Sequence, residues 1–243
     1  MTVTASTVVD GPFLSRLRWS FGGETVDDFD EHVHRSVPGY REGHNIIAQL
    51  SDFFVWEGSR VIEVGCSTAT LTRLLAERHA STNATFHGVD IEPRMVDQAR
   101  KRCSGLSSVN IELADAQRID FTGSSFVVMY YTLQFFPPDH RLALLQRICT
   151  EMRPGGALVL FEKTRTPDAR LQDLLNQMYE DFKLQAGFSA DEILKKSHCL
   201  RGVLEPLTTA LNLQLLNTAG FIDSWPIYKY LAFEGFLGVK PLF

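Results

Sequence analysis

The sequence predicts an α/β domain in which a seven-stranded, mostly parallel sheet is covered by helices on both faces. The first observation is that short, almost continuously apolar segments alternate with segments of helical period. The second is that the apolar segment 61–64 runs into a turn of small residues at 65–69 and then a helix start, while the next strand ends at Asp90. A strand, a small-residue turn and an acid one βαβ unit later are typical of Rossmann-like folds that bind a nucleoside.

Residues 1–55 precede the first strand and differ from the rest, with an aromatic pair at Trp19 and Phe21 and an acidic stretch from 27 to 31. We predict a short helix over 27–37, ended by Pro38 and Gly39. An amphipathic helix follows over 40–54, because its apolar residues recur at i, i+3 and i+4. An aromatic-rich helical segment before a nucleotide-binding fold suggests an N-terminal helical lid over 1–55, with a Rossmann-like core over 56–243.

In the core, strands are predicted at 60–65, 85–90, 109–113, 126–131, 156–162, 221–230 and 231–239, and helices at 69–79, 93–103, 139–151 and 207–218. Residues 167–201 interrupt this alternation with a helical period of leucines and with Ser189, followed by two acids, as a helix N-cap. We interpret 167–201 as a helical insertion over the ligand. The last strand is expected to run antiparallel.

Composition favours a small-molecule enzyme in the cytoplasm. The 243 residues are 44% hydrophobic, enough for one sizeable core. A net charge of −5 argues against a direct nucleic-acid partner. No segment resembles a leader peptide or approaches the roughly 18 apolar residues that span a bilayer, and the four cysteines form no C-x-x-C pair. Two lid helices and an exposed terminal strand are compatible with a homodimer.

The small-residue turn indicates which nucleoside is bound. Only the first glycine of G-x-G-x-x-G survives, with Ser67 and Ala69 at the other small positions. A pyrophosphate needs the full motif against the helix N-terminus. The turn instead resembles that of class I S-adenosylmethionine (SAM) dependent methyltransferases, whose ligand has no phosphate.

Three acids have expected roles in such a site. Asp90 would accept the two ribose hydroxyls, with a helix N-cap as its alternative role, and Asp115 would face the adenine amino group. Glu63 would lie under the methionine portion and reach its ammonium directly or through water; a buried acid bonded to loop amides is the alternative. Cys66 is interpreted as a small filler. His32 and His34 face different sides of a helix, so no metal site is expected.

Several segments together resemble the carboxy-S-adenosylmethionine synthase family, which serves tRNA wobble-uridine modification. The matches are Arg35-Ser36-Val37-Pro38-Gly39-Tyr40, Gly65-Cys66-Ser67, Tyr131-Thr132-Leu133-Gln134-Phe135, Pro154-Gly155-Gly156-Ala157-Leu158-Val159-Leu160, Glu162-Lys163 and Asp181-Phe182-Lys183. The spacing of the resemblance holds from about residue 13 to the C-terminus, so it covers nearly the whole chain. The resemblance implies a SAM site lined by Tyr40, Gly65, Cys66, Ser67, Asp90, Ile91, Asp115 and Ala116.

Two departures from that family bear on the reaction. Its members attach a carboxyl group from prephenate to the SAM methyl carbon, grip it with an arginine, and contact the ligand with an asparagine. Ungapped alignment places Ser197 at the arginine and Tyr130 at the asparagine. A serine hydroxyl cannot neutralise a carboxylate in a dry pocket, and Lys195 or Lys196 would be a poor copy of a bidentate arginine.

The expected reaction is therefore chemistry on SAM itself: the α-amine closes on the γ-carbon, releasing 5′-methylthioadenosine and azetidine-2-carboxylate. Azetidine synthases of bacterial nonribosomal-peptide pathways do this on a similar fold. Tyr130, Tyr131, Phe135 and Tyr179 would offer aromatic faces, and Gln134 and Ser197 would orient the substrate. Core packing is the alternative for each ring. Small-molecule methylation is the second hypothesis, carboxy-SAM synthesis the third, and a non-enzymatic SAM-binding module the fourth.

Overall fold

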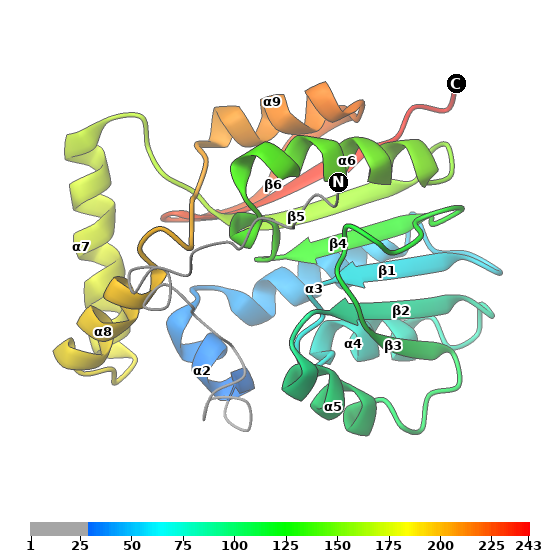
Figure 1. Ribbon diagram of the computed structural model, residues 1–243, viewed down its shortest axis with the longest axis horizontal. Coiled ribbons are helices and arrows are strands. Elements are labelled where there is room, and N and C mark those ends of the chain that lie inside the picture. Colours follow the sequence, from blue (N-terminus) through cyan, green and yellow to red (C-terminus); the bar gives the residue numbers. More distant parts are fainter. Residues whose placement is uncertain (1–28) are drawn as a thin grey trace, which may run out of the picture.

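The computed structural model describes residues 29–243, which form one seven-stranded sheet with helices on both faces (Figure 1). The strand order is β3-β2-β1-β4-β5-β7-β6. All pairs from β3 to β5 are parallel, and β7 is antiparallel to both β5 and β6. The chain reverses direction across the sheet between β1 and β4, and ligands of open α/β sheets bind at the carboxyl ends of strands at such a point.

The predicted α/β architecture is confirmed, with element bounds within a few residues of those expected. The strands are β1 (Arg60–Val64), β2 (Thr85–Asp90), β3 (Val109–Leu113), β4 (Phe126–Tyr130), β5 (Ala157–Lys163), β6 (Ile222–Tyr230) and β7 (Phe233–Val239). The helices are α2 (Phe29–Ser36), α3 (Tyr40–Ser51), α4 (Thr70–Arg78), α5 (Pro93–Arg102), α6 (Pro138–Glu151), α7 (Ala169–Gln185), α8 (Ala190–Leu200) and α9 (Thr209–Ala219), with a 3-10 turn, η2, at Leu133–Phe135. The antiparallel final strand is also as predicted.

The core consists of two apolar layers, one on each face of the sheet. Alternate residues of β4 and β5 point to opposite faces, so Val127 packs with α6 and α9 and Val128 packs with α3 and α4. Strands buried on both faces must be apolar throughout, as every residue of β4 is. This rigid sheet fixes the strand ends that carry the candidate site.

Of the predicted lid, only residues 29–55 are described, and the prediction for Trp19 and Phe21 lies outside the described residues. The helix α3 packs against the sheet through the fully buried Ile47. In contrast, α2 lies between α5 and α8 (Figure 1) and contacts both. The division at residue 55 stays a prediction.

The predicted insertion contains α7 and α8, which stand apart from the helices that cover the sheet (Figure 1). Ser189 begins α8 with a capping box to Glu192, as its N-cap pattern predicts. The two helices contribute little to the core: Lys183 is the one buried residue of α7, and Ile193 the one buried residue of α8. The insertion is therefore held mainly by contacts around the candidate site.

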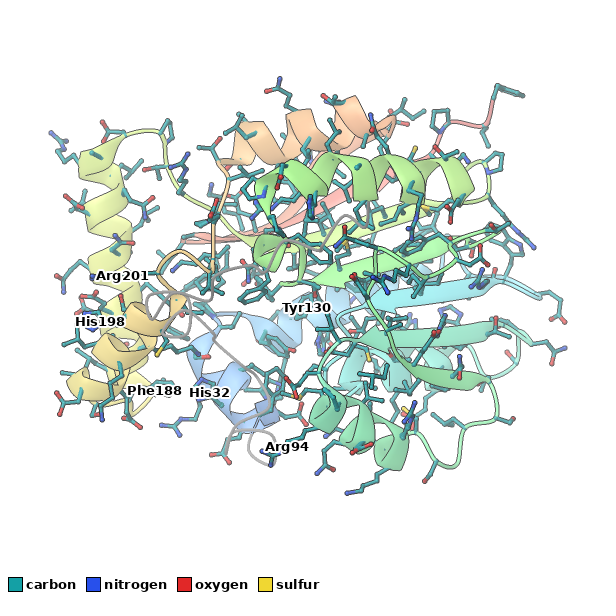
Figure 2. All side chains as sticks on the ribbon, viewed as in Figure 1. His32, Arg94, Tyr130, Phe188, His198 and Arg201 are labelled. Carbon is teal, nitrogen blue, oxygen red and sulfur yellow. The ribbon has the colours of Figure 1, made fainter. Side chains whose placement is uncertain are left out.

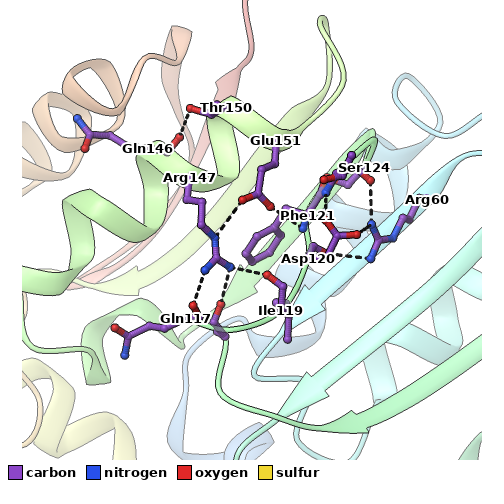
Figure 3. Close-up of polar contacts among 12 residues, drawn as sticks. Arg60, Gln117, Ile119, Asp120, Phe121, Ser124, Gln146, Arg147, Thr150 and Glu151 are labelled. Carbon is purple, nitrogen blue, oxygen red and sulfur yellow. Dashed lines mark hydrogen bonds and ion pairs between the residues drawn. The ribbon is translucent and has the colours of Figure 1, made fainter.

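The loop between β3 and β4 is fixed by two arginines (Figure 3). Arg147 of α6 donates to the carbonyls of Ala116 (3.0 Å) and Ile119 (2.6 Å). Arg60 donates to Asp120 at 2.8 Å. Because charged donors form strong hydrogen bonds to carbonyls, the loop that carries Asp115 and Ala116 has a defined position.

Within 29–243, no helix is long and apolar enough to cross a bilayer. The four cysteines are all free, and only Cys199 is exposed.

Candidate active site

A cavity of about 730 Å³ lies at the carboxyl ends of the parallel strands, and residues of α2, α7 and α8 also line it. Its size is that of a small-molecule site. Every site residue predicted from the sequence lines it: Tyr40, Glu63, Gly65, Cys66, Ser67, Asp90, Ile91, Asp115, Ala116, Tyr130, Tyr131, Gln134, Tyr179 and Ser197. The structure thus brings the predicted residues together, and their individual roles remain predictions.

The small-residue turn has the backbone conformation that its composition predicts. Gly65 has a φ of +74°, and a Cβ there would lie 2.4 Å from Thr132 Oγ1. Asp90 Oδ2 accepts from the Ser67 amide at 2.8 Å and its Oδ1 from the Glu92 amide at 2.9 Å. Burial raises the pKa of Asp90, opposed by these backbone bonds. The N-cap residue of α5 is Glu92, so Asp90 does not have its alternative role as a helix N-cap. Its role as ribose acceptor stays a prediction.

Two buried groups under the turn have raised pKa values. Glu63 accepts from the Thr72 hydroxyl, and burial raises its pKa to about 8. Cys66 is 3% exposed, and burial together with Glu63 raises its thiol pKa. A thiol in this environment stays protonated and unreactive, in agreement with its interpretation as a filler.

The end of the cavity near Asp115 and Ile91 is more open. Asp115 Oδ1 accepts from the Gln117 amide at 2.9 Å, which turns the loop after β3. Ile91 is 72% exposed although it borders the cavity.

An aromatic wall forms the other side of the cavity. The ring of Tyr130 lies 4.9 Å from Tyr40 and 4.7 Å from Tyr131, both in edge contacts. The Tyr130 hydroxyl donates to the Tyr40 carbonyl at 2.6 Å, linking β4 to α3. This contact requires Gly43, since a Cβ there would lie 2.3 Å from the same hydroxyl. The hydroxyl of Tyr130 is thus occupied. Its ring is only 6% exposed and belongs to an apolar core cluster, which agrees with the core-packing alternative for this ring.

Tyr131 and Gln134 differ in what they can offer a ligand. Tyr131 has a φ of +57°, which is costly for a bulky residue, and its buried hydroxyl has no partner among the described residues. Gln134 is fully engaged: Nε2 donates to the Tyr131 carbonyl at 3.2 Å, and Oε1 accepts from the Lys163 amide at 2.9 Å. In this structure Gln134 therefore joins the ends of β4 and β5, while Tyr131 has a free donor.

The helix α2 is connected to its neighbours on two sides by contacts that sequence reasoning missed. Asp30 of α2 accepts from Thr68 at 2.7 Å and forms an ion pair with Arg102 of α5. On the opposite side, the Tyr179 hydroxyl of α7 donates to the Ser36 carbonyl at 2.8 Å. The helix α2 thereby spans from the core to the insertion.

His32 of α2 contacts two side chains of the insertion. His32 lies edge-on to Phe188 at 5.3 Å and meets Lys196 Nζ at 2.6 Å (Figure 2). Burial, with Lys196, lowers its pKa to about 4, so it is a neutral acceptor. Within the described part of the chain, no group of three or more His, Cys, Asp or Glu side chains is placed to hold a metal.

Three lysines, Lys163, Lys183 and Lys196, also belong to the cavity wall. None was selected as a site residue, although Lys196 was considered as a substitute for the family's arginine. Two of them belong to the matched motifs Glu162-Lys163 and Asp181-Phe182-Lys183. The spacing of Tyr179 and Lys183, one helical turn apart, was the available signal for a shared face.

Residues 61–156 match the model of a methyltransferase domain family. A carboxy-S-adenosyl-L-methionine synthase of Staphylococcus epidermidis is 35% identical over 92% of this chain and 97% of its own length. The synthase of Shewanella amazonensis is 32% identical over 99% of this chain and 100% of its own length.

Solved structures support the fold alone. Magnesium protoporphyrin IX methyltransferase from Synechocystis PCC 6803, with bound SAH, has a TM-score of 0.65 at 15% identity over 90% of this chain and 96% of its own. Human N-acetylserotonin methyltransferase in complex with SAM has a TM-score of 0.62 at 16% identity over 97% of this chain and 60% of its own.

Proposed function

Because the chain belongs to the carboxy-S-adenosyl-L-methionine synthase family, and so to the SAM-dependent enzymes of the class I methyltransferase fold, we propose that it acts on SAM itself. From two residues that differ from the family, we further propose that the reaction is cyclisation to azetidine-2-carboxylate. The residues present fit SAM. The half-buried carboxylate of Asp90 lines the cavity and would accept the ribose hydroxyls, and the buried hydroxyl of Tyr131, without a partner among residues 29–243, faces the same cavity. No phosphate-binding glycine motif is present in the turn.

The proposal rests on one observation: Tyr130 and Ser197 both line the cavity. These are the positions where the family resemblance implies an amide and an arginine. An aromatic ring replaces the amide that contacts the ligand, and a hydroxyl replaces the arginine that would hold an added carboxylate, so carboxylation would lose a charge-assisted bond. In the proposed complex, the part of the Tyr130 ring that borders the cavity would face the sulfonium cation.

The reaction balances without a second substrate. The α-ammonium loses one proton, and the nitrogen lone pair then attacks the γ-carbon. The Cγ–S bond breaks, and its electron pair goes to sulfur. The products are zwitterionic azetidine-2-carboxylate, neutral 5′-methylthioadenosine and one proton. An enclosed aromatic wall suits this step because the positive charge moves from sulfur to nitrogen within the pocket and water must be excluded.

The test is to incubate the pure protein with SAM alone and identify products by mass spectrometry. We expect 5′-methylthioadenosine and azetidine-2-carboxylate, at a rate that rises as the pH approaches the amine pKa. Tyr130→Ala should lower kcat more than it weakens SAM binding, because the ring acts on the shifting charge. Tyr130→Phe is the matched control, since it keeps the ring and loses only the bond to the Tyr40 carbonyl. SAM that stays intact for hours would overturn the proposal.

Carboxy-SAM synthesis is the second candidate. It is supported by identity to the synthases over nearly the whole chain and by Lys196, which lines the cavity next to Ser197. Rapid formation of the carboxylated sulfonium from SAM and prephenate would favour it. S-adenosylhomocysteine formed only with an added acceptor would favour small-molecule methylation.

A further inference from the structure

The guanidinium of Arg102, the last residue of α5, joins three elements of the chain without lining the cavity itself. Its Nη1 donates to the Thr68 hydroxyl at 2.8 Å and to the Thr70 hydroxyl, and its Nη2 forms the ion pair with Asp30 of α2. Asp30 Oδ1 also accepts from Thr68 at 2.7 Å and from Thr70 at 3.2 Å. These four side chains form one polar network, which we call the α2 anchor, and all but Arg102 line the cavity.

The small-residue turn at 65–69 has a backbone that needs such support. Ser67 and Ala69 have φ values of +52° and +59°, a region that residues with a Cβ rarely adopt. Ala69 is also the N-cap of α4, and its methyl group cannot accept a hydrogen bond there. The α2 anchor binds the hydroxyls of Thr68, which lies between these two residues, and of Thr70, which follows them. It therefore holds the turn from outside in the conformation that a ligand would meet.

The same network fastens α2 to the core. Of the eight residues of α2, only Phe29 and Ser36 are buried, although one face of the helix lines the cavity. Phe29 packs with Met95 of α5, and the ion pair of Asp30 lies beside this apolar contact (Figure 1). Burial alone would raise the pKa of Asp30, but its hydrogen bonds to Arg102 and to the two threonines outweigh burial and lower the pKa. Asp30 is therefore charged at neutral pH, and its bond to Arg102 is charge-assisted on both sides.

We propose that Arg102 is a positioning residue, which fastens α2 to the small-residue turn through Asp30 and Thr68 and thereby slows the release of SAM from the cavity. A ligand held between the turn and α2 leaves when one of them moves, and that movement breaks bonds of the α2 anchor. A guanidinium suits this role, because two of its nitrogens donate in one plane, here to a carboxylate and to a hydroxyl. The proposal rests on SAM as the ligand and does not depend on cyclisation.

The experiment measures the association and dissociation rates of S-adenosylhomocysteine by surface plasmon resonance. The variants are Arg102→Met, Asp30→Asn and the double variant, and Arg102→Lys keeps the charge without the planar fork. Arg78→Met is the matched control, because Arg78 also forms an ion pair between helices, with Asp52, and neither residue lines the cavity. Circular dichroism confirms that each variant is folded.

We expect Arg102→Met and Asp30→Asn each to raise the dissociation rate constant roughly tenfold, as for the loss of one charge-assisted bond. The double variant should be no faster than the faster single variant, because both changes remove the same bond. Arg102→Lys should lie between wild type and Arg102→Met, and Arg78→Met should match wild type. A dissociation rate constant unchanged in both single variants, or effects that multiply in the double variant, would overturn the proposal.

This rate constant separates positioning from a general loss of structure, since loss of folded protein lowers the binding amplitude and leaves the rate constant unchanged. No arm requires turnover, so failure of cyclisation would leave the result standing. Wild-type protein that does not bind S-adenosylhomocysteine would overturn the SAM site and this proposal together.

Discussion

Replacing Lys163 by methionine should make the protein more stable, while removing a positive charge from the cavity wall. The wall around Lys163 is aromatic, with Tyr179 4.7 Å from its ammonium. Burial and Lys183 lower its pKa from 10.5 to about 8. That drop corresponds to about 3 kcal/mol of destabilisation when the amine is charged, as an upper value. Methionine retains an unbranched apolar stem and removes the charge.

The pH dependence of this gain has a definite sign. Below pH 8 the amine is protonated in both the folded and the unfolded chain, so the wild type carries the whole penalty. Between pH 8 and 10.5 the folded-state amine becomes neutral first, and the penalty fades; above 10.5 none remains. The advantage of Lys163→Met should therefore be largest at pH 7 and vanish as the pH approaches 10.5.

Urea denaturation at pH 7 and at pH 10, on wild type and variant in parallel, measures this difference. Titrating groups distant from Lys163 cancel in the comparison, whereas the pKa of Lys196, which Lys163 lowers, rises in the variant. Lys195→Met, on an exposed lysine, should change the free energy of unfolding little. A variant no more stable than wild type at pH 7, or one whose advantage is equal at both pH values, would refute the reasoning.

Two further predictions concern the SAM end of the site. Asp90→Ala should weaken SAM binding by about a hundredfold, since the two ribose bonds expected of this charged acceptor would contribute about 3 kcal/mol together; a calorimetric affinity within a factor of two of wild type would contradict the assignment. Glu63 has a pKa raised to about 8 by burial, so it is mostly protonated at pH 7. The SAM ammonium should lower that pKa and displace its proton. Calorimetry in buffers of different ionisation enthalpy should therefore detect proton release on SAM binding, and the release should be absent in Glu63→Gln.

The sheet could be predicted from the sequence because its determinants are local. Strand β4 is apolar at every position, and the turn after β1 has the small residues that its left-handed backbone requires. The lining of the cavity followed, because the carboxyl ends of parallel strands converge at one edge.

The inward position of the cavity lysines and the contacts of α2 could not be predicted from local sequence patterns. In an amphipathic helix Lys183 has the appearance of a solvated residue, and only the docking of α7 turns it inward. The ion pair of Asp30 and Arg102 joins positions 72 residues apart, with no pattern linking them in the chain. The free hydroxyl of Tyr131 depends on a positive φ that its residue type disfavours.

The sparse attachment of α7 and α8 has an evolutionary consequence. Since these two helices bury only Lys183 and Ile193, most substitutions in them leave the free energy of the sheet untouched. Yet they supply Tyr179, Lys183, Lys196 and Ser197 to the cavity wall. Selection can therefore alter what is held beside the sulfonium in a few steps, each tolerated by the fold. A family built this way is free to diverge in chemistry while its nucleoside-binding half stays the same.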